Sequence, residues 1–170
     1  MFAKGLAGIA LAAALATPAS AQLLNHKDLS LATALTIATT AAETCKGQGY
    51  RVSVTVVGRN GEVIVQLRGD DSSPHTIENS QRKAYTSRTF RIPSGEFAQR
   101  VKDNPTSGQV HLSGIVASQG ALPIKVGDEV IGAVGVSGVT GTPTTPAVPG
   151  GVKDEACAKA GIDKVADQLK

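Results

Sequence analysis

The sequence predicts an α+β fold, a single domain in which an antiparallel sheet of about five strands is covered by helices. Two observations support this prediction. Short segments with alternating apolar residues follow one another across turn signals, which is typical of antiparallel hairpins. Segments with apolar residues at three- and four-residue spacing lie before, between and after these hairpins, so the helices are grouped around the sheet. The 170 residues contain no internal repeat.

The first 21 residues have the pattern of a cleaved secretory signal. Lys4 precedes an apolar run over residues 5–16, and the small residues Ala-Ser-Ala follow at 19–21. The run is too short to span a hydrocarbon core of about 30 Å, and it lacks the polar face of a core helix. We expect cleavage after Ala21, a mature domain over residues 22–170, and a periplasmic or secreted location.

The mature chain carries little net charge. The sequence has 17 Lys and Arg residues, 14 Asp and Glu residues and a formal net charge of +3, which the loss of Lys4 lowers to +2. The basic residues are scattered, whereas a phosphate-binding face needs a basic patch. We therefore expect no nucleic-acid partner. No later segment is long and apolar enough to predict a membrane span.

The sequence has two cysteines, Cys45 and Cys157. An oxidising compartment favours a disulfide. One cysteine lies near the end of the first expected helix and the other near the start of the last, so antiparallel packing of these helices would bring the two sulfurs together. The alternatives are two buried free thiols or a metal pair, although two cysteines without a nearby histidine make a poor zinc site.

Nine elements follow from apolar spacing and turn residues. Helices are expected from a cap at Asp28 or Ser30 to Cys45, over residues 74–90, from a cap at Ser94 to Asn104-Pro105, and over residues 152–169. Strands are expected over residues 50–57, 62–68, 109–118, 122–126 and 129–138. The first strand alternates valines with polar residues, which predicts one buried face, and Asn60-Gly61 predicts a hairpin turn. Ser73 is the expected N-cap of the second helix. Residues 140–151 are rich in Pro, Gly and Thr, and are expected to form a surface loop.

Common enzyme signatures are absent from the sequence, which has no G-x-S-x-G elbow, no P-loop and no H-E-x-x-H. Gly132, Gly135 and Gly138 recur within an expected strand, where glycine marks the close approach of another backbone, a flat ligand or a neighbouring subunit. Asp70 and Asp71 could act as a carboxylate pair. Adjacent side chains usually point apart, however, so a solvated turn is the favoured interpretation.

Histidine is the residue type in this sequence that could ligate iron. His26 precedes the first helix, His111 lies in an expected strand, and His75 lies at the start of the second helix. A neutral imidazole can bind haem iron, and the positive end of a helix dipole disfavours the imidazolium. The residues alone leave two roles open for His75, an iron ligand or a polar residue near a helix terminus. They also leave two roles open for Arg82 and Lys83, which could bind an acidic ligand or could lie on a solvated face of the helix.

Five segments, taken in order, resemble the GlcG/HbpS-like family of small haem-binding domains. They are LSLATALTIATTAAETC (29–45), YRVSVTVVGRNGEVIVQLRGD (50–70), RKAYT (82–86), ALPIKVGDEVIGAVGVSG (121–138) and DEACAKAG (154–161). The sequence departs from the family pattern at two places. Asp70-Asp71-Ser72 stands where many relatives have Asp-Gly-Ala, and Gly120-Ala121-Leu122 stands where they have two glycines before Pro-Ile.

The resemblance implies homo-oligomerisation and binding of haem, expected as haem b, or of a related tetrapyrrole. It implies His75 as the axial ligand of the haem iron, because Pro-His-Thr before the RKAYT helix is similar to a histidine-bearing branch of the family. Arg82, Lys83 and, less directly, Arg68 become candidate partners of the haem propionates. Tyr85 becomes a candidate pocket residue or phenolate ligand, although core packing is its favoured role. His75 and Arg82 are seven residues apart, so they are expected on one helix face.

The leading hypothesis is an exported, oligomeric haem-binding protein for haem storage, transfer or sensing, with no catalytic residue assigned. One alternative is a haem-degrading enzyme that releases iron. The other is a non-haem oligomeric module that binds a small carboxylate. Some relatives are paired with signalling proteins, so a signalling or transport partner is a further expectation from the resemblance.

Overall fold

The computed structural model describes residues 22–140 and 149–170. The expected signal segment lies outside these ranges, as do residues 141–148 of the expected loop. Among the described helices, none combines the length and apolar character needed to cross a bilayer.

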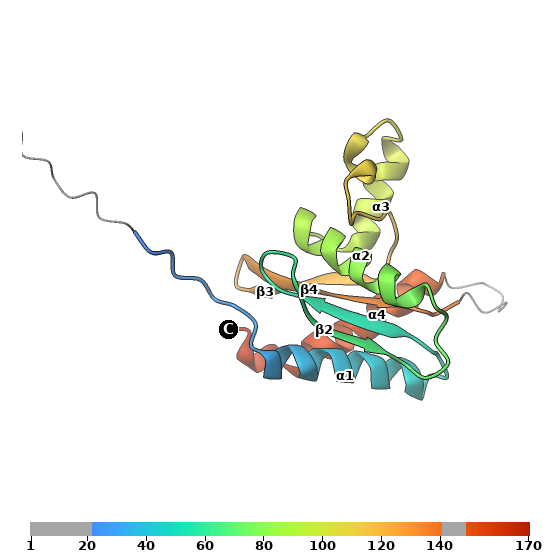
Figure 1. The fold of residues 1–170 in the computed structure, drawn as a ribbon, viewed down its shortest axis with the longest axis horizontal. Helices are drawn as coiled ribbons and strands as arrows, with labels where there is room; N and C mark the ends of the chain where they lie inside the picture. The colour runs from blue at the N-terminus through green and yellow to red at the C-terminus, as the bar shows by residue number, and fades with distance from the viewer. Residues whose placement is uncertain (1–21, 141–148) are drawn as a thin grey trace, which may run out of the picture.

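The described residues form an α+β domain with one antiparallel sheet, as predicted (Figure 1). The sheet contains β1 (Ser53–Val57), β2 (Val63–Arg68), β3 (Ala121–Val126) and β4 (Glu129–Ser137), in the order β2-β1-β4-β3. The helices are α1 (Leu31–Gly47), α2 (Thr76–Phe90), α3 (Ser94–Asp103) and α4 (Gly150–Lys164), with the short 3₁₀ segments η1 (Gly108–His111) and η2 (Ala166–Gln168). The four strands of the described residues are close to the five expected.

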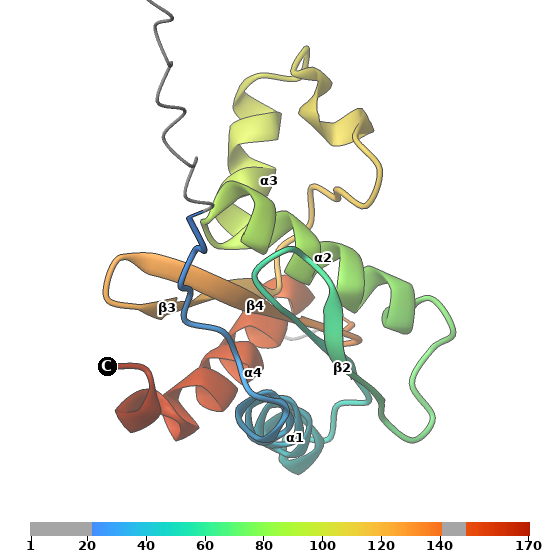
Figure 2. The same ribbon diagram turned by 60° about the vertical axis from the view of Figure 1, so that its left-hand side comes forward.

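The predicted strand over residues 109–118 is wrong. This segment holds part of η1 and an irregular connection from α3 to β3. Two of its backbone groups bond to side chains of α2 rather than to a strand: the Ile115 carbonyl accepts from Arg82 at 2.8 Å, and the Val116 N–H donates to Thr86 Oγ1 at 2.9 Å. Its Leu112 and Ile115 N–H groups donate to carbonyls within the segment. Ile115 of this segment is buried, whereas Leu112 is exposed. The α3–η1 arm projects away from the sheet in both views (Figures 1 and 2).

The main apolar core lies on the face of the sheet that is covered by α1 and α4 (Figure 2). All five buried residues of α1 are apolar: Ala34, Ile37, Ala38, Ala41 and Cys45. They pack with valines of β1 and β4 and with Cys157 and Ala158 of α4. Cys45 and Cys157 form a disulfide with a Cα–Cα distance of 5.7 Å, which confirms the predicted pairing.

The opposite face of the sheet is also buried, under α2. Ser53 and Thr55 were expected on an exposed face, yet every residue of β1 is buried. The two hydroxyls bond to Thr76 and Ser80 of α2, both at 2.8 Å. A Cβ on Gly135 would lie 2.2 Å from the Ser80 carbonyl oxygen, so glycine is what lets the helix backbone lie against β4. This bears out one of the three roles considered for the strand glycines.

Candidate functional site

His75 lies immediately before α2, which begins at Thr76. Its backbone is in the α region (φ −70°, ψ −16°), and its carbonyl accepts a hydrogen bond from the Asn79 N–H at 3.0 Å. Ser73 was expected to cap α2 through its hydroxyl, and this is wrong. Its carbonyl oxygen accepts the hydrogen bonds instead, from the Thr76 N–H at 3.1 Å and from the Thr76 hydroxyl at 2.7 Å. The helix thus starts from a tight turn that presents His75 at its end.

The imidazole of His75 lines a small hollow of about 240 Å³, here called the His75 hollow. The start of α2, the end of β4 and the start of α4 all contribute to it. Its lining residues are Ser73, His75, Thr76, Asn79, Lys83, Ser118, Gln119, Ser137, Gly138, Val139, Thr140, Gly150 and Gly151. Most of these offer hydroxyl, amide or backbone groups, so the lining is polar.

The His75 ring is available for a ligand. The residue is exposed, and no described residue hydrogen bonds to the imidazole. A neutral imidazole offers one acceptor nitrogen and one N–H donor. Asn79, four residues further on, lines the same hollow and donates to the Ser137 hydroxyl at 2.9 Å. Sequence reasoning did not single out Asn79, although its spacing of one helical turn from His75 was a usable signal.

Lys83 also lines the His75 hollow and forms a buried ion pair. The two side chains, Lys83 and Asp154 of α4, are each 3% exposed, and their Nζ–Oδ2 distance is 2.9 Å. Lys83 also donates to the Val136 carbonyl at 3.1 Å, and Asp154 accepts from the Val139 N–H at 3.1 Å. Burial raises the pKa of the Asp154 carboxyl, and the attraction of the Lys83 ammonium and the Val139 N–H offset this only in part. The ammonium is therefore already engaged by protein groups.

Arg82 and Tyr85 lie outside the His75 hollow. The Arg82 guanidinium donates to the Ile115 carbonyl at 2.8 Å and lies 3.6 Å from Glu78. The Tyr85 ring packs against the β1–β2 turn, where a Cβ on Gly61 would lie 2.5 Å from it. The expected pairing of His75 with Arg82 is replaced by His75 with Lys83, because the side of α2 that faces the hollow carries Asn79 and Lys83.

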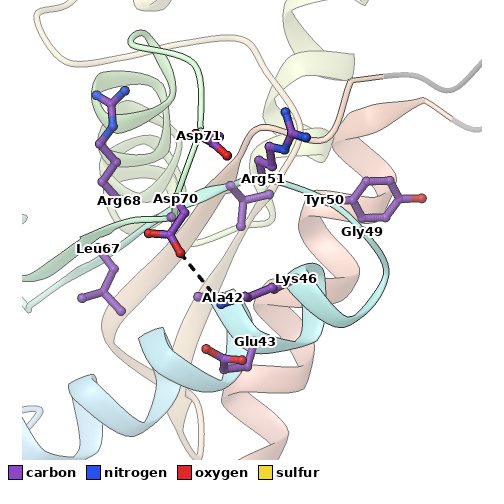
Figure 3. Close-up of a pocket in the computed structure, with 12 residues that line it drawn as sticks. Ala42, Glu43, Lys46, Gly49, Tyr50, Arg51, Leu67, Arg68, Asp70 and Asp71 are labelled. Carbon is purple, nitrogen blue, oxygen red and sulfur yellow. Dashed lines mark ion pairs between the residues drawn. The ribbon is translucent and has the colours of Figure 1, made fainter.

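Arg68 lines a different and larger hollow of about 480 Å³, here called the Arg68 hollow (Figure 3). Ala42, Val52 and Leu67 give it apolar walls, and charged residues surround them. Figure 3 shows Glu43 and Lys46 on α1 and, across the hollow, Arg51, Arg68, Asp70 and Asp71, with both guanidinium groups pointing away from α1.

The acidic turn that begins at Asp70 separates the Arg68 hollow from His75. Asp70 and Asp71 are exposed, as predicted for a solvated turn, and Asp70 lies 3.9 Å from Lys46 in an exposed ion pair. The Arg68 guanidinium donates to the Ser72 carbonyl at 2.8 Å, three residues before His75. Among the described residues, no cluster of three His, Cys, Asp or Glu side chains is arranged to hold a metal ion.

By its fold, the protein is a small α+β domain with one antiparallel sheet between helices. The sequence matches the family described as haem degrading protein HbpS-like over residues 29–163. The chain belongs to this HbpS-like family.

Solved structures agree with this assignment. The crystal structure of HbpS is 32% identical, with a TM-score of 0.74, and the match covers 84% of this chain and 93% of that chain. A double mutant of Streptomyces reticuli HbpS is 31% identical, with a TM-score of 0.74, covering 87% and 96% of the two chains. The PduOC:heme complex is 22% identical, with a TM-score of 0.68, covering 80% and 94%, and is similar in fold. No curated protein sequence matches significantly.

Proposed function

We propose that this protein is an exported haem-binding protein in which His75 supplies a nitrogen ligand to the haem iron. Membership of the HbpS-like family supports a haem-related function, and a protein of similar fold has been crystallised as a heme complex. The observation that carries the proposal is the exposed imidazole of His75, which has no hydrogen-bond partner among the described residues and lines a hollow.

His75 can ligate the haem iron, but the His75 hollow of a single chain does not enclose the tetrapyrrole ring. An open imidazole nitrogen suits iron. The His75 hollow, at about 240 Å³, is smaller than the roughly 300–1,000 Å³ of typical ligand pockets, and its lining is polar. A tetrapyrrole ligated by His75 would therefore extend beyond the hollow. We propose that a second copy of the chain covers the rest, which agrees with the expected homo-oligomer.

The three candidate partners of the haem propionates, Lys83, Arg82 and Arg68, each bind groups of the protein within one chain. Lys83 is neutralised by Asp154, and Arg82 is held by Glu78 and the Ile115 carbonyl. Arg68 holds the turn before His75 through the Ser72 carbonyl, so we propose that it positions the histidine. When bound, haem would supply an iron centre able to bind a further ligand and to exchange electrons.

A titration with ferric haem, followed in the Soret region, tests the role of His75. We expect His75→Ala to abolish or blue-shift the Soret band and to weaken binding on the order of tenfold or more, which corresponds to about 1.4 kcal/mol. His26→Ala and His111→Ala are matched controls because both histidines are also exposed, and they should leave the titration unchanged. An unaltered spectrum and affinity in His75→Ala would rule out this residue as the ligand.

Haem degradation is the second candidate function, since the family description names it. Addition of ascorbate to the haem complex in the presence of catalase separates degradation from storage. Loss of the Soret band would indicate degradation, whereas a stable ferrous spectrum would indicate binding alone. Failure to bind haem at micromolar concentrations would favour the non-haem module instead.

Export is proposed from the signal pattern over residues 1–21. A mature N-terminus at Gln22, measured by mass spectrometry of the protein from the periplasm or the medium, would support it. A full-length chain retained in the cytoplasm would contradict it.

A further inference from the structure

Most of the buried residues of the helix that follows His75 are polar. Six residues of α2 are buried, and Ala84 is the only apolar one; the others are Thr76, Ser80, Lys83, Thr86 and Ser87. The buried residues of α1, on the other face of the sheet, are all apolar. The two faces of one sheet are therefore held by different kinds of interaction.

Side-chain hydrogen bonds join α2 to two strands of the sheet. Thr76 and Ser80 bond to Ser53 and Thr55 of β1. Asn79 donates to Ser137 of β4 at 2.9 Å. Among the described residues, the apolar cluster on this side is small and consists of Val57, Ala84 and Ala133.

These contacts cost less to open than an apolar interface of the same size. Exposure of apolar surface is unfavourable in proportion to its area. Hydroxyl and amide groups exchange their protein partners for water when they are exposed, so each hydrogen bond contributes only modestly to the net free energy. Opening would also rehydrate the charges of Lys83 and Asp154, whose burial is unfavourable.

The other side of the sheet resists opening. Its apolar core joins α1, α4 and the valines of β1 and β4, and the disulfide between Cys45 and Cys157 links the two helices covalently. This part of the molecule would remain folded while α2 separates from it, which is the behaviour of a locally unfolding unit.

We propose that α2 is a separately opening unit that leaves the sheet while α1, α4 and the sheet stay folded. The His75 hollow is shared between the two parts. Thr76, Asn79 and Lys83 belong to α2, whereas Ser137 and Gly150 belong to β4 and α4. Each opening of α2 therefore takes the hollow apart, and a ligand that contacts both sides holds α2 closed.

Native-state hydrogen exchange of the ligand-free mature protein tests the proposal. We expect the amides of residues 80–90 to be protected on the order of tenfold or more weakly than those of β1 and β4, after correction for intrinsic rates. Their exchange should depend weakly on low concentrations of urea, since opening one helix exposes little surface. Equal protection and equal urea dependence in α2, β1 and β4 would overturn the proposal.

A pair of variants tests the part played by the buried charges. In Lys83→Met/Asp154→Leu, the opening of α2 no longer gains free energy from hydration of two charges. We therefore expect hydrogen exchange of residues 80–90 to slow on the order of tenfold, while exchange of β4 is unchanged. Lys159→Ala/Asp163→Ala is the matched control, because this ion pair is exposed, and it should leave α2 exchange unchanged. Unaltered α2 exchange in the Met/Leu variant would exclude a role for the buried pair. The wild-type comparison decides the main proposal even if the variant does not fold.

No haem is added in these measurements. Their outcome is therefore separate from that of the haem titration, and either proposal can fail while the other stands.

Discussion

Removal of the disulfide by Cys45→Ala/Cys157→Ala should lower the free energy of unfolding by about 5 kcal/mol. The two cysteines are 112 residues apart in the sequence, and the chain-entropy model assigns about this value to a loop of that length. Both side chains are fully buried between α1 and α4, so the truncation to alanine adds a further packing loss.

Urea denaturation followed by circular dichroism measures the effect. We expect a lower midpoint for the variant and a larger m-value, because the unfolded chain without its cross-link is more expanded. Wild-type protein with its disulfide reduced is the control, and it should unfold near the midpoint of the variant. If the variant and the oxidised wild type unfold at the same urea concentration, the cross-link contributes nothing to stability.

Removal of one partner of the buried Lys83–Asp154 ion pair should lower the free energy of unfolding by a similar amount. Lys83→Met leaves the Asp154 carboxylate buried, with the Val139 N–H as its remaining partner among the described residues. We expect the free energy of unfolding to fall by about 3–5 kcal/mol at neutral pH, as is typical when one partner of a buried pair is removed. The double variant Lys83→Met/Asp154→Leu should be as stable as the wild type or more stable, because no charge remains buried.

The loss in Lys83→Met should depend on pH. Burial raises the pKa of Asp154, and removal of the ammonium raises that pKa further. A carboxyl with a raised pKa in the folded state takes up its proton before the unfolded chain does. The loss is therefore fully present above the folded-state pKa and shrinks as the pH falls through it.

Urea midpoints of Lys83→Met measured at neutral pH and in acid check the size of the stability loss and its dependence on pH. Lys159→Met, which removes one member of an exposed ion pair, is the matched control and should change the stability by less than about 1 kcal/mol. A single Lys83→Met variant as stable as the double variant would show that burial of the unpaired Asp154 carboxylate does not destabilise the fold.

Much of the fold could be predicted from local patterns in the sequence. Alternating residues identified β1, β2 and β4, and turn residues such as Asn60-Gly61 identified a hairpin. Apolar spacing identified α1, and the same spacing placed Cys45 and Cys157 on helices that could meet. These features depend on neighbours within a few residues, which is why the sequence carries them.

The segment over residues 109–118 shows the limit of such patterns. Its apolar residues favour a strand, but a strand forms only where a partner backbone satisfies its N–H and C=O groups. Here Arg82 and Thr86 of α2 satisfy the Ile115 carbonyl and the Val116 N–H. No local pattern reveals that competition.

By itself the sequence determined the helices, the hairpins, the cysteine pair and the presence of His75 at a helix start. Only the tertiary structure decided what surrounds that histidine. It placed Lys83 in the lining of the His75 hollow and paired its ammonium with Asp154, 71 residues away in the sequence. It also placed Arg82 and Tyr85 outside that hollow. It also buried Ser53 and Thr55 under α2. The physical reason is that periodicity fixes which face a side chain occupies, whereas the partner of that face depends on packing between distant segments.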